Sequence, residues 1–307
     1  MLRDVTVVGV VRGLCVGLAT LDLVQRVGRR PGVDEKMVAQ SSDLAAGGPA
    51  AAAAVTFSAL GGQATLLSAL GPGPIGRLVK DDLNGAGVRT VDAWAGGADL
   101  SVSAITVLAG TGERSVVSRN ADDIVIAVPA DLPGLIQHTD VVLIDGHHPG
   151  LAVAAGRAAK VAGAPVVLDC GSTKAVYDDL VPLADAVVCS SNFVGSPDEF
   201  DAVAAALLSA GARLVAMTAG AAPVRWRTQS STGAVKVPMV TVRDTLGAGD
   251  VLHGAFAFAR AQGVTDPDHS LSFAVAVASL RVQHAGPRSW LNDPRLQGFG
   301  RLPANLK

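Results

Sequence analysis

Asp244-Thr-Leu-Gly-Ala-Gly-Asp250 joins a strand-like run, Val235–Val242, to a predicted helix, Asp250–Gln262. A strand that leads through a glycine loop into a helix is the repeating unit of α/β sheets. The small residues Gly247–Gly249 let backbone amides approach a ligand closely. The first turn of the helix adds unpaired N–H groups and the positive end of its dipole. The heptapeptide therefore predicts an anion-binding loop within an α/β fold.

Asp250 stands where a carboxylate in the first helical turn would point toward a ligand held by the loop. From there it could accept a proton from an attacking hydroxyl. Phosphoryl transfer needs both features, donors for the developing charge and a base that orients the nucleophile. The alternative is an ordinary glycine turn in which Asp250 caps the helix. The complete seven-residue string favours the ligand-binding interpretation.

Outward from the loop, short β-branched runs alternate with alanine-rich stretches at helical spacing. This alternation is typical of parallel strands joined by crossover helices, and it predicts a doubly wound α/β sheet. The expected strands are Val5–Val10, Ala64–Ala69, Val141–Ile144, Pro165–Leu168, Ala186–Cys189 and Leu214–Met217. The other expected helices are Ala50–Leu60, Gly76–Asn84, Leu151–Ala162 and Phe200–Ala210.

Two stretches, about residues 14–43 and 91–118, break the alternation. The second has strand-like spacing of apolar residues around the turn Ala109-Gly-Thr-Gly112. We expect the two stretches to form a small antiparallel sheet inserted into the main fold. Since no internal repeat or long linker is visible, residues 1–307 are expected to form one domain that carries this insertion.

Composition and charge limit the classes of partner. The 307 residues are 49% hydrophobic but only 4% aromatic, with 25 Lys and Arg against 27 Asp and Glu. We therefore expect a globular protein with no basic surface for nucleic acid or an anionic membrane. The three cysteines lack metal-site spacing, and the N-terminus lacks a signal-peptide pattern. These features predict a cytoplasmic protein whose partners are small molecules or copies of itself.

The heptapeptide resembles the C-terminal signature of the ribokinase-like (PfkB) carbohydrate kinases, and the resemblance covers nearly the whole chain. Its other parts are Leu21-Asp22-Leu23, Gly47-Gly48 to Ala53, Gly71–Gly76 and Gly112-Glu-Arg114, with Ser68-Ala-Leu-Gly-Pro-Gly73 most similar to ketohexokinase-type members. The resemblance implies a Rossmann-like, doubly wound and mainly parallel sheet with a small β-sheet lid. It also implies an ATP-dependent kinase that phosphorylates a hydroxyl of a sugar or sugar-like molecule and dimerises through the lid.

The same resemblance implies roles for individual residues. The catalytic base would be Asp250, and the anion hole Gly247, Ala248 and Gly249. The sugar site would include Asp22, Gly47, Gly48 and Ala52, and the nucleotide site Asn192, Thr218, Gly220, Thr245, Gly247 and Gly249. Mg²⁺ would neutralise the ATP phosphates. Asp244 and Thr245 would support the loop or bind a monovalent cation such as K⁺.

Two positions near the sugar site depart from the family pattern. Ala52 stands where the family has an asparagine that binds sugar, and Pro49 where ketohexokinases have another. Neither side chain can hydrogen-bond a hydroxyl, so we expect a different acceptor or weaker binding. Asn192-Phe-Val-Gly195 also lacks the glutamate of the family's Asn-x-x-Glu motif, which organises magnesium and phosphates.

Two other functions remain open from the residues alone. Gly71-Pro-Gly-Pro-Ile-Gly76 satisfies the G-x-G-x-x-G pattern, with Asp92 further along, and allows a dinucleotide-binding oxidoreductase. Its two prolines remove backbone donors and count against that function. The missing amides at Ala52 and Pro49 allow a non-catalytic sugar- or nucleoside-binding relative.

Three histidines near the predicted ligand edge each allow two interpretations. His147-His148 could bind a metal or line the cleft, or could form a satisfied pair at a strand end. No third ligand at suitable spacing accompanies them, which favours the structural role. His253 follows Asp250 by about one helical turn, so it could approach the nucleotide or pack against the sheet.

Overall fold

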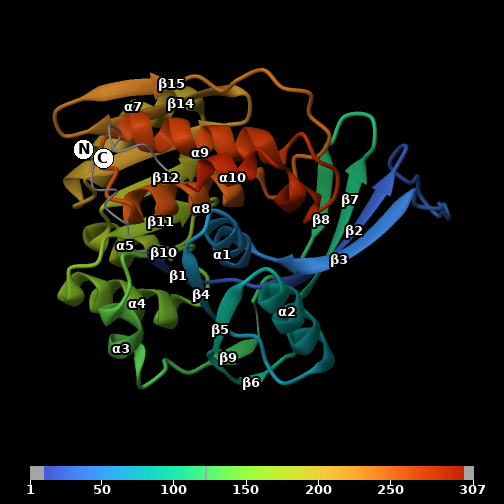
Figure 1. The fold of residues 1–307 in the computed structure, drawn as a ribbon, viewed down its shortest axis with the longest axis horizontal. Helices are drawn as coiled ribbons and strands as arrows, with labels where there is room; N and C mark the ends of the chain where they lie inside the picture. Colours follow the sequence, from blue (N-terminus) through green and yellow to red (C-terminus); the bar gives the residue numbers. More distant parts are fainter. Residues whose placement is uncertain (1–9, 122, 301–307) are drawn as a thin grey trace, which may run out of the picture.

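The computed structural model describes residues 10–121 and 123–300, which form a large sheet, two smaller sheets and the helices around them (Figure 1). The large sheet has the strand order β15-β14-β13-β12-β11-β10-β1-β4-β5. The strands from β13 to β5 run parallel, and β14 and β15 are antiparallel at one edge. Their bounds are β1 Arg12–Val16, β4 Gln63–Ser68, β5 Val88–Asp92, β10 Val141–Ile144, β11 Val166–Cys170, β12 Ala186–Ser190, β13 Leu214–Ala219, β14 Ala222–Thr228 and β15 Thr232–Val235.

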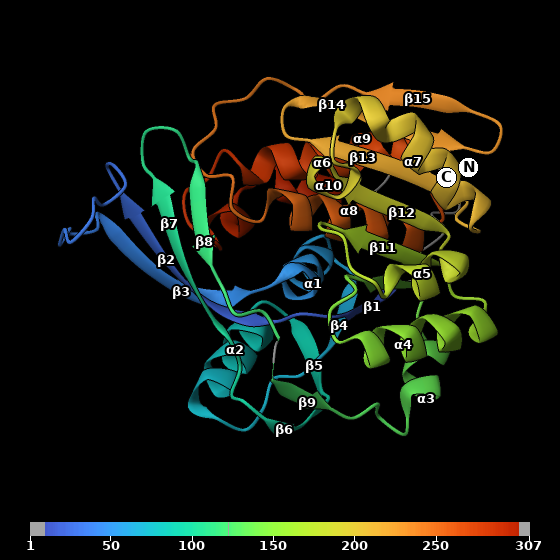
Figure 2. The ribbon, with the colours of Figure 1, turned by 180° about the vertical axis from the view of Figure 1, so that it is seen from behind.

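Helices cover both faces of the large sheet (Figure 1, Figure 2). Alternate residues of a strand point to opposite faces, so Leu143 packs with α1, α8 and α9, whereas Val142 and Ile144 pack with α4 and α7. In the described ranges no helix is both long and apolar enough to cross a membrane. The helix bounds are α1 Pro49–Ala59, α2 Pro74–Gly85, α3 Leu132–Gln137, α4 Pro149–Ala162, α5 Tyr177–Leu180, α6 Ser191–Val194, α7 Phe200–Ser209, α8 Ala248–Ala261, α9 Pro267–Arg281 and α10 Leu296–Phe299, with 3₁₀ turns η1 Val181–Leu183, η2 Pro197–Glu199 and η3 Ser289–Asn292.

A four-stranded sheet projects from one side of this body (Figure 1). Its strands, in the order β3-β2-β7-β8, are β3 Ser41–Gly47, β2 Thr20–Val27, β7 Val102–Leu108 and β8 Arg114–Val117. The β3-β2 and β7-β8 pairs are antiparallel, and β2 pairs with β7 in parallel. One face buries Val24, Ile105 and Val107 against Leu246 of the glycine loop. A separate two-stranded sheet joins β6 Trp94–Gly97 to β9 Ile124–Ile126.

The expected fold class is confirmed, but some boundaries were wrong. The predicted strand Val235–Val242 ends at its first residue, because the chain beyond Val235 has no strand beside it and Met239 is fully exposed. The predicted strand Val5–Val10 falls almost wholly in residues 1–9, outside the described ranges. Residues 14–16, placed in the inserted sheet, belong instead to β1, which is buried between β4 and β10.

Candidate active site

An open pocket of about 450 Å³ lies where the four-stranded sheet meets the N-terminal ends of α1 and α8. Several residues that were predicted far apart in the sequence meet here. The lining is Asp22, Ala46, Gly47, Gly48, Ala52, Val55, Leu246, Gly247, Asp250, Val251, Arg281, Pro287, Arg288 and Trp290.

Asp250 enters the pocket from the first turn of α8. The helix begins at Ala248, two residues earlier than expected, and Gly247 is its N-cap with a left-handed φ of 72°. That conformation suits glycine, and it places Asp250 at the third helical position. Burial raises the pKa of the Asp250 carboxyl, while the nearby charges of His253 and Arg114 act in the opposite direction. The helix start thus presents a carboxylate beside the first backbone N–H groups of α8.

Asp22 faces the same pocket from β2 and accepts a hydrogen bond from the Thr20 hydroxyl at 2.7 Å. A Cβ atom at Gly47 would lie 2.0 Å from the Asp22 carboxylate, so only glycine leaves this carboxylate in place. Gly48 has φ 89°, and a Cβ there would lie 2.5 Å from the Leu18 carbonyl oxygen. Burial raises the pKa of Asp22, although hydrogen bonds from Thr20 and Ser103 lower it.

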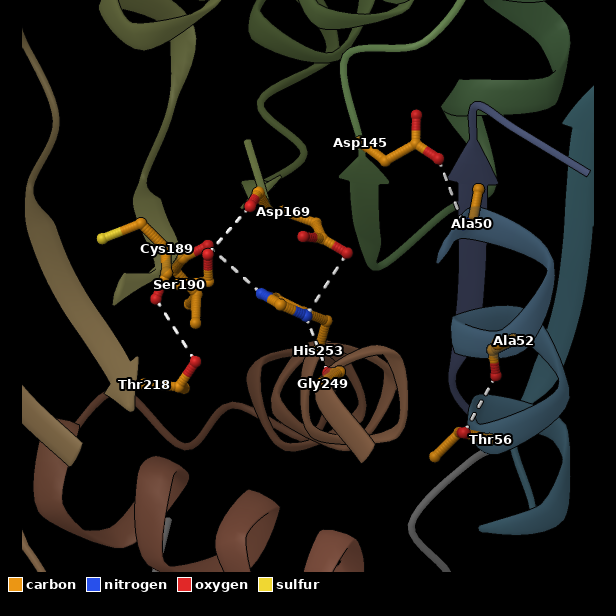
Figure 3. Close-up of polar contacts among 12 residues, drawn as sticks. Ala50, Ala52, Thr56, Asp145, Asp169, Cys189, Ser190, Thr218, Gly249 and His253 are labelled. Atoms are coloured by element: carbon orange, nitrogen blue, oxygen red, sulfur yellow. Dashed lines mark hydrogen bonds and ion pairs between the residues drawn. The ribbon is translucent and has the colours of Figure 1, made fainter. Parts of the chain in front are cut away.

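Ala52 presents only a methyl group to the pocket. Its carbonyl oxygen accepts the Thr56 hydroxyl at 2.9 Å, within α1 (Figure 3). Pro49 occupies the first position of α1, where a missing N–H costs little. The two departures from the family pattern therefore remove side-chain amides without disturbing the helix that carries them.

The residues predicted to bind the nucleotide lie at the carboxyl ends of neighbouring strands. Thr218 of β13 is in register with Ser190 of β12, and the Ser190 hydroxyl accepts the Asn192 N–H at 3.2 Å. Gly220 forms the left-handed turn between β13 and β14. The first turn of α8 lies between Thr218 on one side and Ala50 and Ala52 on the other (Figure 3). Asn192, Thr218 and Gly220 are on the ligand edge of the sheet but do not line the pocket.

Asp244 is almost fully buried, and both of its oxygen atoms have protein partners. Oδ1 accepts the Leu246 N–H at 2.9 Å, and Oδ2 accepts the Gly286 N–H at 3.0 Å. The Nη2 atoms of Arg26 and Arg281 each lie 3.8 Å from Oδ2. Two guanidinium groups thus stand where a monovalent cation would have to bind. These surroundings do not fit K⁺, and Asp244 ties the loop to its neighbours instead.

Thr245 connects the loop to the four-stranded sheet. Its hydroxyl donates to the Gly112 carbonyl oxygen at 2.9 Å and lies 3.3 Å from Arg114 Nη1. The Thr245 N–H donates to the same carbonyl oxygen at 3.1 Å. Arg26 adds hydrogen bonds to the Arg243 carbonyl oxygen at 3.0 and 3.3 Å. The tip of the β7-β8 hairpin is therefore bonded directly to the predicted anion-binding loop.

The G-x-G-x-x-G stretch has a structural role. Asp92 Oδ1 accepts the N–H groups of Leu70 and Gly71 at 2.9 and 3.3 Å, and Asp92 Oδ2 pairs with Lys80 at 2.8 Å. A carboxylate of the chain itself thus occupies donors that a pyrophosphate would need. The structure therefore does not support a dinucleotide-binding site in this stretch.

Sequence reasoning missed several residues that build the site. Asp145 follows β10 directly and accepts N–H groups of Leu18 at 2.8 Å, Ala50 at 3.1 Å and His147 at 2.8 Å. Although burial would raise the pKa of Asp145, His147 and these donors hold it below the usual value. Its position just after a predicted strand was the available signal. Arg281, Arg288 and Trp290 had no motif to identify them.

The contacts of His147 and His148 favour a structural role for this pair over metal binding. His147 Nδ1 lies 3.2 Å from Asp145 Oδ1, and His148 is buried in a left-handed conformation at the start of α4. Across residues 10–121 and 123–300, no group of three or more His, Cys, Asp or Glu side chains is arranged to hold a metal ion.

Proteins with similar sequences include a ribokinase and a ribose-1-phosphate kinase. Ribokinase from Bacillus subtilis (strain 168) is 30% identical over 286 residues, covering 88% of this chain and 93% of the relative. An ATP-dependent ribose-1-phosphate kinase from Halopiger xanaduensis is 26% identical over 285 residues, covering 91% and 94%. These alignments span nearly the full length of each protein.

Solved structures show the same architecture. A protein of Agrobacterium tumefaciens assigned as a ribokinase superposes with a TM-score of 0.81 at 28% identity, covering 92% of this chain and 94% of the other. Arabidopsis thaliana ribokinase, solved with ribose and ATP, superposes with a TM-score of 0.74 at 23% identity, covering 95% and 99%. The model of the pfkB family carbohydrate kinases matches residues 12–293. The chain therefore belongs to the pfkB family of carbohydrate kinases, as its heptapeptide first indicated.

Proposed function

We propose that this ATP-dependent sugar kinase uses Asp250 as the base that activates the acceptor hydroxyl. The observation that carries the proposal is the meeting of Asp250 and Asp22 in one pocket, beside the N-terminus of α8. Asp250 would accept the hydroxyl proton as the oxygen attacks the γ-phosphorus of ATP. The backbone N–H groups of Gly247–Gly249 would stabilise charge on the transferred phosphoryl group.

The acceptor would lie between β2, the start of α1 and the start of α8. Asp22 would accept hydrogen bonds from the hydroxyl groups of the acceptor, and Gly47 and Gly48 line the same pocket. Because Ala52 offers no amide, the site must select its acceptor by other contacts. The named activities of the relatives make ribose and ribose 1-phosphate the first acceptors to assay, together with other pentoses, hexoses and nucleosides.

The nucleotide would bind along the carboxyl ends of β12 and β13. Asn192, Thr218 and Gly220 would contact it there, and Thr245 would hold the loop that receives its phosphates. Mg²⁺ bound to ATP would neutralise phosphate charge during transfer. The supporting observation is that these residues share the strand ends at which open α/β sheets bind ligands.

The four-stranded sheet would act as a lid that excludes water from the pocket. Its outer face carries the exposed side chains Leu44, Val102 and Val117. Leu44 and Val117 lie in one row across the sheet, and Val102 is on the same face two residues before Ala104 of that row. An apolar patch of this kind supports a homodimer formed through the lid. Light scattering would then show a dimer for the wild-type chain and a monomer for Val117→Asp. A monomeric wild-type chain would contradict this part of the proposal.

The three cysteines support a cytoplasmic setting. Cys15, Cys170 and Cys189 are all buried and unpaired. Burial raises the pKa of the Cys15 and Cys189 thiols to about 12, so they stay protonated and unreactive. Thiols that are kept reduced are usual for cytoplasmic proteins.

Asp250→Asn tests the assignment of the base. The amide cannot accept the proton, so kcat should fall by about 10²–10⁴-fold while the Kd for ATP stays close to that of the wild type. Coupled ATP turnover and calorimetric ATP binding measure the two quantities. Near-normal turnover in this variant would rule out Asp250 as the base. If the wild-type chain binds a sugar tightly but turns over no ATP with any acceptor, the non-catalytic alternative is correct.

A further inference from the structure

His253 lies beneath the loop and contacts three different elements. It is on α8, one turn after Asp250, and only 4% of it is exposed. Its Nδ1 is 2.7 Å from the Gly249 carbonyl oxygen, and its Nε2 is 3.1 Å from the Val188 carbonyl oxygen in β12. Asp169 Oδ2, at the end of β11, lies 3.3 Å from Nδ1 (Figure 3). The ring therefore joins the first turn of α8 to two strands of the large sheet.

These contacts decide the protonation of the ring. A carbonyl oxygen only accepts hydrogen bonds, so a neutral imidazole, with its single N–H, could bond only one of the two carbonyl groups. The imidazolium form bonds both. Asp169 Oδ2 is buried and has no hydrogen-bond donor within the described part of the chain, so it is available as the counter-ion. Burial raises the pKa of Asp169 to about 6, and the charge of His253 acts in the opposite direction.

The charges around the pair explain why a cation is useful there. Asp145 from β10 and Asp250 from α8 both act on Asp169, and Lys174, in the segment after β11, partly offsets them. Arg114 from β8 and Arg281 from α9 act on Asp250. Three buried or half-buried carboxylates thus converge on this end of the sheet, and an imidazolium ion reduces their mutual repulsion.

We propose that His253 and Asp169 form an ion pair that positions the catalytic base. The imidazolium holds the Gly249 carbonyl group, and with it the first turn of α8, against β11 and β12, and it places positive charge behind Asp250. His253 is a positioning residue, since it acts through Gly249 and Asp250. The inference rests on the proposed role of Asp250.

His253→Gln removes the charge and keeps a polar side chain. We expect kcat to fall by about tenfold to a hundredfold, with KM for ATP and for the acceptor changed much less, because the reacting groups lose alignment. Since His253 lowers the pKa of Asp250, its loss should also move the acid limb of the kcat/KM profile to higher pH. A purely structural role would lower the melting temperature and leave that limb in place, which would overturn the proposal. The exposed His269 on α9 provides the matched control, His269→Gln, which should change neither quantity.

A second measurement does not depend on activity. With ¹⁵N-labelled histidine, the wild-type protein should show two protonated ring nitrogens for His253 at pH 7, and His253→Gln would serve only to assign the signal. A single protonated nitrogen would overturn the ion pair. If the wild-type chain turns over no ATP, the proposed function fails, yet this spectrum still tests the pair.

Discussion

Gly254 of α8 packs directly against α1. A Cβ atom at this position would lie 2.5 Å from the Ala53 carbonyl oxygen and 2.8 Å from the Thr56 Cβ atom. Both distances are far below ordinary van der Waals contact, and the oxygen belongs to the backbone of α1, which cannot turn aside. Gly254→Ala must therefore separate the two helices whose first turns build the pocket.

The cost of this separation can be estimated. Overpacking a dense core costs about 1–3 kcal/mol, whereas replacing glycine by alanine in a helix returns up to about 1 kcal/mol. Gly150→Ala near the start of α4 isolates the second effect, because a Cβ there meets nothing within 4 Å. The free energy of unfolding of the Gly254 variant should be lower than that of the Gly150 variant by about 1–3 kcal/mol.

Urea unfolding followed by circular dichroism measures the stability difference, and coupled ATP turnover measures its effect on the site. Displacement of α8 by about 1 Å should lower kcat/KM by about a hundredfold in Gly254→Ala and leave Gly150→Ala unchanged. Equal stability and equal turnover of the two variants would refute the argument that this helix contact positions Asp250.

Three further predictions follow from the site. Asp145→Ala leaves three N–H groups without their acceptor and should cost about 3 kcal/mol or more in urea unfolding. Because the pKa of Asp145 is lowered in the folded state, its contribution is present above the ordinary value of 3.8 and is lost as the pH falls below it. A wild-type and an Asp145→Asn protein whose stabilities change equally below about pH 4 would contradict this. Replacing K⁺ by choline should change turnover by less than about twofold, since Arg26 and Arg281 already neutralise Asp244; strong activation by K⁺ would show that a cation displaces them. Ala52→Asn should raise turnover of ribose or fructose in an acceptor panel, and an unchanged panel would show that the missing amide does not set specificity.

The features that the sequence determined by itself are those whose physics is local. The loop Asp244–Asp250, the helix that follows it and the alternation of strands and helices depend on neighbouring residues, and so the α/β class and the kinase family could be predicted. The site predictions for Asp22, Gly47, Gly48 and Asp250 came from motifs, and these residues do line one pocket. Their chemical roles stay predictions.

Other features were decided only by the tertiary structure. Asp145, Asp169 and His253 acquire their roles because strands far apart in the sequence end side by side, and each carboxylate takes partners from elements that no local pattern names. Arg26 and Arg281 lie 255 residues apart in the sequence, and their guanidinium groups both lie 3.8 Å from the Asp244 carboxylate. Burial and long-range charge shift the pKa values of Asp145 and Asp169. Both effects depend on the order in which the strands and helices pack rather than on the residues beside these carboxylates in the chain.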